Sequence, residues 1–584
     1  MCNSVQQAAQ QLTFGLPGQI QSCLRKVARA EAKARALTPA EYAVFSANFN
    51  SGQLLVAYSD ETQVMSDLER IRFCDFEGKN VLFQLELFPE AVFSLAHTTF
   101  QDCRIESGSR VCRTSRVRRT VLLAYCNVEG CGLVSGPKTI ATNFGNGLRV
   151  SPGLGTGERA VSVVLESTLE HVARVSLDQF QCPPSHGEEY SARVAEYISQ
   201  CSSEFTIICE LARVEQCPEL LCCFVGRKCV VSSGSTLRHS TLMELCVVEQ
   251  NSTVDTCLLQ PRVKLASQAI AVNSLLCQQS QVDCQGKLLD SVLGPRAHLA
   301  EGEINASLIG PLVGFHHQAM LIATFWPRGR GNVGYGANCG SNHTSRCADQ
   351  SLWPGEGVFF GLGCCIKLPL NLTLAAYSIV ATGVTFGPGK LVFPFSLVTS
   401  GNGTECQVAP GWGIESNAYS LERNEMKMAS RAPDGYDSKV FSQFVAKQVY
   451  VARLVLIRAL GASDKQVFKH EAGMELGGGF ALRKDFEKGV RGYTRFLQLY
   501  SLRNAVGRFR VVQVPDQVAS AEIDQTWEVD YAQTGMSLDS EEDERETVEW
   551  FLRRVFAPEQ VGKPCVESYP RADMRKPLDW TRIW

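Results

Sequence analysis

The chain has 584 residues, with 57 lysines and arginines against 60 aspartates and glutamates, and it contains 24 cysteines. This length allows a large hydrophobic core, and an apolar share of 45% with 20% charged residues is ordinary for a folded protein. The composition therefore excludes a disordered, collagen-like or purely coiled-coil chain. A net charge of −3 gives no electrostatic reason to expect nucleic acid as a partner.

The N-terminus does not predict a secretory signal, because no basic region precedes an apolar run. The most apolar stretch, residues 449–460, is interrupted by Arg453 and Arg458, so we expect no membrane span. These features favour a cytoplasmic location and reduced cysteines that act as small core residues. Import into an organelle stays open, because the first thirty residues contain no Asp or Glu, while Arg25 and Arg29 lie on a helix-prone stretch.

Residues 1–100 predict an N-terminal helical and capping region. A helix is expected at about residues 19–36, which are rich in Ala, Lys, Arg and Gln. A second helix is expected to begin at Thr38, because Thr38 can cap it and Glu41 completes a capping box. Pro39 suits the first helical position. Short β-type runs follow at 54–58 and 81–83.

From about residue 101, aliphatic residues recur every six positions, a spacing that suits neither a helix nor a simple hairpin. The first set is Ile105, Val111, Val117 and Leu123. The spacing returns at Val225, Val231, Leu237 and Met243 and continues to Leu299. A fixed six-residue period is typical of a parallel β-helix of hexapeptide repeats. Three hexads, about 18 residues, would complete one triangular coil, with small residues at the tight inward positions. These include Cys229, Cys246, Cys257, Cys277 and Cys284.

The period divides the chain into five parts. Residues 1–100 form the cap, 101–157 the first coils, 158–220 a helical insertion, 221–400 the main β-helix, and 401–584 a helical C-terminal region. Residues 314–356 form a Gly- and Asn-rich excursion from the repeat. In the C-terminal region, helices are expected at 439–460 and 486–502, with a short one at about 548–555. Capping the open coil is the default role for the terminal helices.

Several motifs between residues 143 and 431 resemble one family. They are Asn143-Phe144-Gly145-Asn146-Gly147, Gly310-Pro311 before His316-His317, Asn332-x-Gly334-x-Gly336-x-Asn338-x-x-Ser341-Asn342-His343, Trp353-Pro354-Gly355-Glu356-Gly357, Phe393-Pro394-Phe395-Ser396-Leu397 and Arg423-Asn424-x-x-Lys427-x-x-x-Arg431. In that order they resemble the uncharacterised family called domain of unknown function 4954, over roughly residues 38–510. The resemblance implies a single-chain left-handed β-helix of the hexapeptide-transferase kind and no established activity. Gln318 stands where members of the family often have a Lys, which puts activity in doubt.

The best candidates for chemistry lie in the excursion. We predict His316, His317 and His343 as catalytic, because a neutral imidazole can take a proton from a hydroxyl or amine at working pH. Arg328 and Arg330 could hold a phosphate or carboxylate. The predicted substrate-binding set is Arg328, Arg330, Asn332, Asn338, Asn342 and Glu356.

Structural interpretations of the same residues stay open. Asparagines at regular spacing often form ladders at the turns of a β-helix, and exposed arginines are often only solvated. Adjacent histidines in a strand point to opposite faces, so only one would face a given pocket. A zinc site built from His316, His317, Cys339, His343 and Cys347 matches no standard spacing, and we predict no metal.

Two functions follow from these features. The first is a hexapeptide-type transferase that acts on a sugar or nucleotide-sugar, with acyl-coenzyme A or a nucleotide-sugar as the donor and His316 or His317 as the base. The second is a non-catalytic scaffold that binds protein partners in a larger assembly. Transferases of this class look trimeric, so a trimer is expected for the first function, and the sequence does not decide the oligomeric state.

Overall fold

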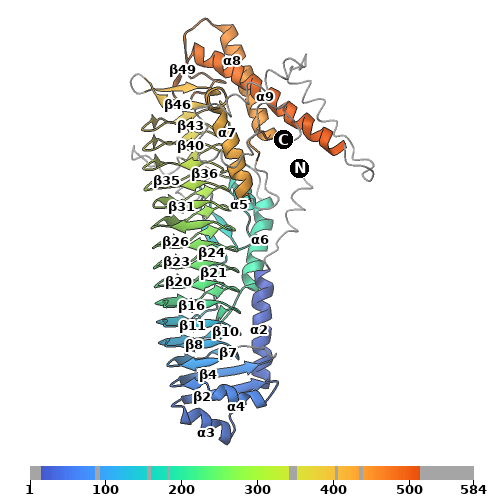
Figure 1. Cartoon of the computed structure of the whole chain (residues 1–584), viewed down its shortest axis with the longest axis vertical. Coiled ribbons are helices and arrows are strands. Elements are labelled where there is room, and N and C mark those ends of the chain that lie inside the picture. The colour runs from blue at the N-terminus through green and yellow to red at the C-terminus, as the bar shows by residue number, and fades with distance from the viewer. Residues whose placement is uncertain are drawn as a thin grey trace, which may run out of the picture. The chain divides into compact units, whose positions relative to one another are not determined.

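The computed structural model describes residues 15–85, 93–153, 159–181, 185–340, 351–401, 405–432 and 439–512. The described chain is mainly a parallel β-solenoid of about 16 turns, with helices in its N-terminal region, an insertion and its C-terminal region (Figure 1). Within the described ranges, residues 15–327 and Ser351 belong to one compact unit, and residues 328–340 and 352–512 belong to a second. None of the described helices combines the length and apolar character that crossing a membrane requires.

The first unit contains three ladders of short parallel strands, one for each face of the coil. The first face contains β3 (Ile71–Arg72), β5 (Ser94–Ala96), β8 (Arg110–Cys112), β11 (Asn127–Glu129), β16 (Arg213–Glu215), β19 (Val230–Val231), β22 (Val247–Val248), β25 (Lys264–Leu265), β28 (Gln281–Asp283), β31 (His298–Ala300) and β34 (Gly314–Phe315). The second face contains β6 (Thr99–Gln101), β9 (Arg116–Arg118), β12 (Leu133–Ser135), β17 (Glu219–Leu221), β20 (Thr236–Arg238), β23 (Thr253–Asp255), β26 (Ile270–Val272), β29 (Lys287–Leu289), β32 (Glu303–Asn305) and β35 (Met320–Ile322). The third contains β7 (Arg104–Glu106), β10 (Thr120–Leu122), β15 (Thr206–Ile208), β18 (Phe224–Val225), β21 (Thr241–Leu242), β24 (Leu258–Leu259), β27 (Leu275–Leu276), β30 (Val292–Leu293), β33 (Leu308–Ile309) and β36 (Phe325–Trp326). Two longer strands, β2 (Ser51–Tyr58) and β4 (Asp75–Gln84), pair side by side and lead into β6 and β7.

The periodic aliphatic residues point into this coil, as the sequence predicts. Val225, Leu242, Leu259 and Leu276 pair in register along the third face, and none is more than 1% exposed. Successive coils here are 17 residues apart, where the sequence analysis expected about 18. The difference arises because one of the three steps, such as Leu237 to Leu242, takes five residues.

Buried hydroxyls satisfy part of the inner backbone. Ser274, Ser291, Ser307 and Thr324 are fully buried, and each of the last three donates its backbone N–H to the hydroxyl oxygen one coil earlier, at 3.0–3.2 Å. A buried hydroxyl without such a partner would cost roughly 1–3 kcal/mol. Cys229, Cys246, Cys257 and Cys277 are also buried, as predicted. Cys284 is exposed, which corrects its assignment as an inward filler; it lies just after β28, at a corner with a positive φ of 48°.

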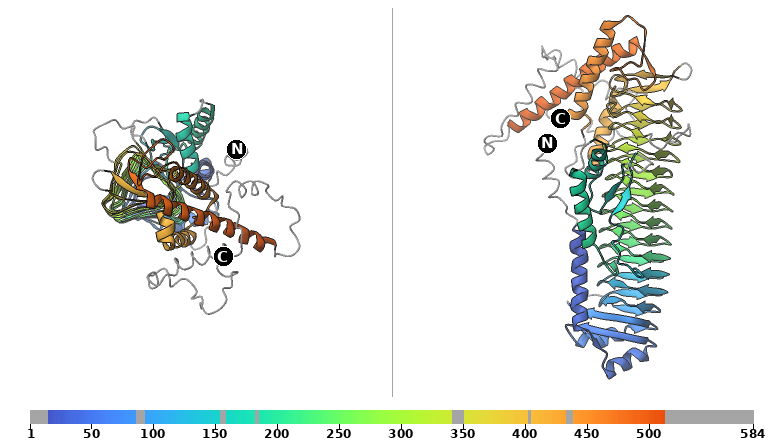
Figure 2. Two further views of the ribbon diagram at one scale, coloured as in Figure 1. Left: turned by 90° about the horizontal axis from the view of Figure 1, so that it is seen from above. Right: turned by 180° about the vertical axis from the view of Figure 1, so that it is seen from behind.

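The N-terminal helices differ little from those expected. Helix α2 (Leu16–Lys33) buries a stripe formed by Leu16, Ile20, Cys23, Val27 and Ala30, and it lies along the strand stack (Figure 2). Helix α3 (Pro39–Ala47) begins at the predicted capping box, in which the Glu41 N–H donates to Thr38 Oγ1 at 3.3 Å and the Thr38 N–H donates to Glu41 Oε2 at 2.7 Å. Helix α4 (Thr62–Leu68) follows β2. Strand β1 (Arg35–Ala36) pairs antiparallel with β2. The strands of 51–84 therefore already belong to the β structure that was expected to start at 101.

The insertion contains a hairpin, β13 (Leu148–Val150) with β14 (Val161–Val163), and two helices, α5 (Leu169–Gln181) and α6 (Ser185–Gln200). Ladder strands resume at Thr206, which pairs with Thr120. The helical part of the insertion therefore ends before residue 220, the predicted boundary. The hexad also runs through 206–220, because the buried residues Ile208, Val214 and Leu220 are six positions apart and pair with strands from before the insertion. The expectation that the whole of 158–220 lacks the repeat is wrong for this stretch.

The described residues of the second unit form three further parallel ladders and three helices. The ladders are β37 (Asn332–Val333), β40 (Phe359–Phe360), β43 (Ile379–Val380) and β46 (Leu397–Ser400); β38 (Asn338–Cys339), β41 (Cys365–Ile366) and β44 (Thr385–Phe386); and β39 (Leu352–Trp353), β42 (Leu370–Asn371) and β45 (Gly389–Lys390). Strands β47 (Cys406–Ala409), β48 (Val467–Lys469) and β49 (Phe480–Leu482) extend the first of them. The helices are α7 (Trp412–Arg431), α8 (Gln443–Ala462) and α9 (Arg483–Val512). The helix expected at 548–555 lies outside the described residues.

Candidate functional site

His316 and His317 lie at a corner of the first unit, directly after β34. His317 and Gln318 have positive φ angles of 49° and 57°, and both side chains are exposed, whereas His316 is half-buried. Because the two histidines follow the strand instead of belonging to it, the strand alternation behind the opposite-face expectation does not apply to them. Their ring centroids lie 5.9 Å apart.

The stacking of coils brings a carboxylate to His317. Glu301 occupies the same corner one coil earlier, directly after β31, and its Oε2 atom lies 2.9 Å from His317 Nδ1. Both side chains contact solvent, with exposed fractions of 58% for His317 and 42% for Glu301. The pair is therefore accessible to a ligand.

A second histidine–carboxylate pair lies beside the first. His298 Nε2 is 3.1 Å from Asp283 Oδ2, and the His298 ring packs edge-on against His316 with centroids 5.8 Å apart. We call Asp283, His298, Glu301, His316 and His317 the histidine cluster. It places three imidazoles and two carboxylates at one corner of the coil.

A polar groove of about 540 Å³ adjoins the histidine cluster. Glu301 lines it together with amide, hydroxyl and thiol side chains. These are Gln250, Asn251, Ser267, Gln268, Cys284, Gln285 and Gln318. Neighbouring side chains in this groove bond to one another, since Gln285 Nε2 donates to Gln268 Oε1 at 2.9 Å and Ser267 Oγ donates to Gln250 Oε1 at 2.7 Å. Such groups donate and accept hydrogen bonds and suit a ligand rich in hydroxyls.

Cys284 is the exposed thiol of this groove, but its surroundings oppose a nucleophilic role. Burial, the Asp283 carboxylate and the Glu301 carboxylate raise the pKa of Cys284. A nucleophilic cysteine needs the opposite, namely neighbours that stabilise the thiolate. The chemistry of the cluster therefore rests on the imidazoles. A neutral His317 that donates its Nδ1 proton to Glu301 carries the free lone pair on Nε2, which is the form a general base requires.

The predicted arginine and glutamate residues form a different arrangement, within the second unit. Arg330 pairs with Glu356 at 2.9 Å, and their side chains are only 8% and 3% exposed. The Tyr377 hydroxyl also donates to Glu356, at 3.0 Å, and Arg330 donates to the backbone carbonyl of Lys439 at 3.1 Å. Burial and the Glu356 carboxylate raise the pKa of Tyr377 well above its ordinary value, so the phenol stays a hydrogen-bond donor. Arg330 and Glu356 thus form a buried network that leaves little of either side chain for a substrate.

Arg328 is the accessible member of the predicted set, with 53% of its side chain exposed. Its guanidinium lies 3.7 Å from Glu356 and 3.6 Å from the centroid of the Phe444 ring. This geometry is a cation–π contact on the surface of the second unit. The positive charge of Arg328 therefore already interacts with Glu356 and with the Phe444 ring.

The predicted asparagines divide into two groups. Asn332 and Asn338 lie in the ladder strands β37 and β38, where they pair with Phe359 and Cys365, so they belong to the repeat and not to a loop. Their Oδ1 atoms are buried and accept no hydrogen bond within the described part of the chain. Asn342 and His343 lie outside the described residues.

No group of three or more His, Cys, Asp or Glu side chains within the described ranges is arranged to hold a metal ion. Cys339, one of the residues weighed for zinc, is fully buried, and burial and the neighbouring Cys364 raise its pKa well above the ordinary value. His343 and Cys347, also weighed for zinc, lie outside the described residues.

Asp283, His298 and Glu301 were missed by sequence reasoning. Asp283 ends the short strand β28, His298 begins β31, and Glu301 lies at the corner after β31. Charged residues are unremarkable at such partly exposed positions of a repeat. The signal that could have found them is the coil length, because residues about 17 positions apart share a corner. With that spacing, Glu301 falls beside His317 and Cys284 beside Glu301.

Comparisons with known proteins add little to this geometry. No model of a known protein family matches the chain. The chain is 33% identical over 132 residues to an uncharacterised protein of Treponema pallidum, and this match covers 22% of the chain and 18% of that protein. No solved structure matches.

Proposed function

We propose that the chain is a transferase-like member of the uncharacterised hexapeptide β-helix family called domain of unknown function 4954. The aliphatic columns with steps of six, six and five residues support a hexapeptide-type repeat. Corners occupied by residues with positive φ, such as Gln250 and Asn251, give the tight turns that such a coil needs. The left-handed sense of the coil is part of the same proposal, and an experimental structure would test it.

The observation that carries the proposed activity is the 2.9 Å contact between His317 and Glu301 at the edge of the polar groove. In the proposed reaction the acceptor is a sugar hydroxyl and the donor is an acyl thioester such as acyl-coenzyme A. His317 Nε2 removes the hydroxyl proton, and the hydroxyl oxygen forms a bond to the acyl carbon. The carbon–sulfur bond breaks, and the proton passes from His317 to the leaving thiolate. A nucleotide-sugar is the alternative donor.

Glu301 acts on this reaction through His317. Its carboxylate accepts a hydrogen bond from the Nδ1–H group, which fixes the tautomer and stabilises the imidazolium while Nε2 holds the substrate proton. A positioned base of this kind contributes roughly 10²- to 10⁴-fold to a rate. Gln318 supplies an amide beside the base, where a Lys would have supplied a charge. The proposed acceptor is therefore a neutral hydroxyl compound.

A thermal-shift screen of the full chain against acyl-coenzyme A, nucleotide-sugars, sugar phosphates and neutral sugars tests the proposal, followed by a transfer assay with the ligands that stabilise the fold. Stabilisation rises with the ratio of ligand concentration to its dissociation constant. We expect His317→Ala to abolish transfer and His298→Ala, one coil away, to retain part of it. If no donor or acceptor shifts the wild type, or if His317→Ala transfers at the wild-type rate, the proposed activity is wrong.

A second candidate function is a non-catalytic scaffold in a cytoplasmic assembly. Helix α8 favours it, because Val451, Leu454 and Ile457 are 58%, 39% and 41% exposed and recur every three residues along one side of the helix. Exposed apolar stripes of this kind mark surfaces that contact other proteins. Leu454→Lys would then abolish partner binding while His317→Ala would not. The oligomeric state, measured by native mass spectrometry, separates the two candidates further, because a trimer favours the transferase.

A further inference from the structure

Three rings stack near the N-terminal end of the first unit. Two of them lie at corners that follow strands of the first face, as His317 does at the other end of that face. Phe49 and Phe73 are nearly parallel, with centroids 5.2 Å apart and an interplanar angle of 4°, and Phe73 and His97 are 4.8 Å apart at 6°. Phe73 follows β3 and His97 follows β5, so each ring comes from a separate coil. We call Phe49, Phe73 and His97 the aromatic row.

Two features of the aromatic row are energetically unfavourable. The residues have positive φ angles of 61°, 54° and 51°, a conformation that bulky side chains adopt only at a cost. Phe49 and Phe73 are also 74% and 49% exposed to solvent. Other corners that follow strands of the first face have polar side chains in this conformation. Examples are Arg113, Gln216, Ser233 and Gln250. Ring stacking recovers about 0.5–1.5 kcal/mol per pair, but it does not require exposed phenylalanines.

A row of polar side chains runs parallel to the aromatic row. Ser51, Asp75 and Thr99 pair in register on adjacent strands, and each lies two residues after one of the rings. Ser51 Oγ donates a short hydrogen bond to the Asp75 carboxylate. The two rows therefore line opposite sides of one groove.

Two residues between the rows, Cys74 and Thr98, form the floor of this groove, and they are 2% and 3% exposed. Asn50 fixes the floor, because its amide donates to the carbonyls of Phe45 and Ile71 and its oxygen accepts from the Cys74 N–H at 2.9 Å. Burial raises the pKa of Cys74 to about 12, so its thiol is inert. The groove has a volume of about 370 Å³.

We propose that this groove binds a neutral carbohydrate chain. Its lining combines exposed aromatic rings with four hydroxyls, one carboxylate and one imidazole, and it contains no Lys or Arg. A phosphate-bearing ligand would need such a cation. Hydroxyls, which both donate and accept, match the hydroxyls of a sugar, while the rings cover its C–H surfaces. Because successive coils repeat the same three elements, the groove suits a ligand that repeats as well.

This proposal does not rest on the proposed transferase activity. The aromatic row follows β3 and β5 at one end of the first face, whereas His317 follows β34 at the other end of that ladder. Removal of the His317 imidazole leaves the aromatic row untouched. Glycan binding and transfer can therefore fail separately.

Binding is tested on the full chain by calorimetry, with neutral oligosaccharides of glucose, galactose, mannose and N-acetylhexosamine as probes. Inorganic phosphate and tetramethylammonium serve as the anionic and cationic comparisons. We expect at least one neutral oligosaccharide to bind the wild type and the His317→Ala variant equally. If no oligosaccharide binds, or if only phosphate or tetramethylammonium binds, the carbohydrate proposal is overturned.

Variants at the corner separate binding from folding. Phe73→Asn and Phe49→Asn remove a ring, and Asn tolerates a positive φ better than Phe does. We expect each to weaken oligosaccharide binding at least tenfold, whereas Phe73→Tyr, which keeps the ring, binds as the wild type does. Gln216→Asn is the matched control, because Gln216 has a φ of 53° at a corner outside the groove. Wild-type affinity in Phe49→Asn and Phe73→Asn would show that the rings only stabilise the coil and would refute the site.

Discussion

His317 Nδ1 lies 2.9 Å from Glu301 Oε2, and the two residues are joined by the stacking of coils and not by proximity in the sequence. They are 16 residues apart and occupy equivalent corners of adjacent coils. Because the coils stack in register, residues about one coil length apart in the sequence lie side by side, and here they are an imidazole and a carboxylate. This contact places an imidazole–carboxylate pair at the edge of a polar groove, and the proposed transfer rests on that pair.

We expect Glu301→Gln to lower kcat of the proposed transfer about 100-fold, since the amide cannot stabilise the imidazolium as a carboxylate does. The KM of the acceptor should change less than kcat. Glu301 and His317 are both exposed to solvent, so the thermal midpoint should stay close to that of the wild type. Steady-state kinetics and a melting curve on the same preparation check these expectations. An unchanged kcat would show that Glu301 does not orient His317.

Loss of the buried carboxylate in the second unit should be costly. Glu356 is 3% exposed and accepts from both Arg330 and Tyr377, so Glu356→Ala removes the carboxylate that balances the charge of a buried guanidinium. We expect the free energy of unfolding to fall by about 3–5 kcal/mol. The matched control is Arg328→Ala, which removes an exposed contact and should cost less than about 1 kcal/mol. Equal effects of the two changes in denaturant titrations would contradict the assignment of Glu356 to a structural network.

The fold was more predictable than the site. The aliphatic period predicted the coil because one inward position of each strand is regularly filled by an aliphatic side chain. Thr38 and Glu41 predicted the start of a helix because a capping box depends only on residues close in the sequence. The corner contacts were not predictable in the same way. Pairing of Glu301 with His317 depends on the register between coils, and a coil of about 17 residues instead of 18 changes which residue lies beside His317 at the corner.

The predicted substrate-binding set shows the same limit. Arg330 and Glu356 are polar residues in a Gly-rich segment, which favours an exposed ligand site. The structure buries both, because Tyr377 and the Lys439 carbonyl supply the remaining hydrogen bonds. Those partners are distant in the sequence, so composition alone cannot separate a satisfied buried pair from a site that awaits a ligand.

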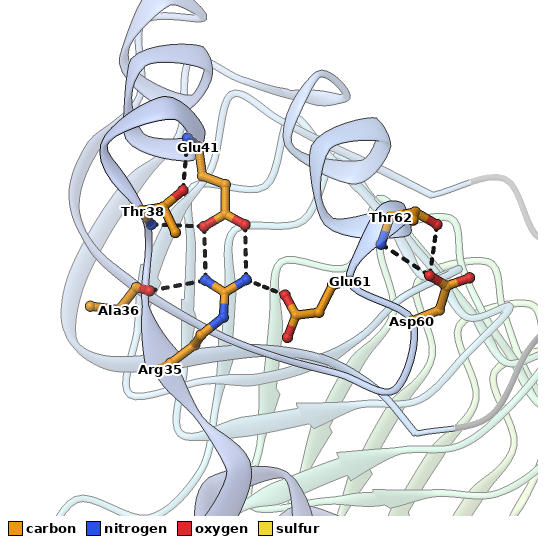
Figure 3. A network of polar contacts seen from close by, with 7 residues as sticks. All are labelled: Arg35, Ala36, Thr38, Glu41, Asp60, Glu61 and Thr62. Carbon is orange, nitrogen blue, oxygen red and sulfur yellow. Dashed lines mark hydrogen bonds and ion pairs between the residues drawn. The ribbon is translucent and has the colours of Figure 1, made fainter.

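The N-terminal ion pair predicts a pH dependence of stability. Arg35 donates to both Glu41 oxygens, at 2.8 and 2.9 Å, and also contacts Glu61 (Figure 3). The Arg35 hydrogen bonds lower the pKa of Glu41 to about 2 from an ordinary 4.5. Between these values the unfolded chain binds more protons than the native chain, so this stabilisation is complete above about pH 4.5 and is lost as the pH falls toward 2.

We expect Glu41→Gln to lower the free energy of unfolding at pH 7 by about 1 kcal/mol, because Arg35 is one-third exposed and solvent screens the pair. The difference from the wild type should shrink as the pH falls below about 4.5. Glu61→Gln is the control, since Glu61 is 61% exposed and lies outside the capping box. Urea titrations of the three proteins from pH 7 to pH 3 measure both effects. A constant difference across this range would show that ionisation of Glu41 does not contribute.

The cysteines of the first unit should differ sharply in reactivity. Cys257 and Cys277 are buried in the coil, and burial raises the pKa of each thiol to about 12. Cys284 is exposed, although burial, Asp283 and Glu301 raise its pKa as well. We expect iodoacetamide at pH 8 to label Cys284 slowly in the native chain and to label Cys257 and Cys277 only after denaturation, because alkylation needs both access and a thiolate.

Peptide mass spectrometry over a time course follows each thiol separately. Cys284→Ser is the matched control, because it removes the exposed thiol and should leave the protection of the two buried cysteines unchanged. Protection of Cys257 and Cys277 then reports the opening of the coil, whose strands at these positions pair on both sides. Labelling of Cys257 at the rate of Cys284 would mean that the coil opens readily in solution, and it would contradict the assignment of these cysteines to a closed core.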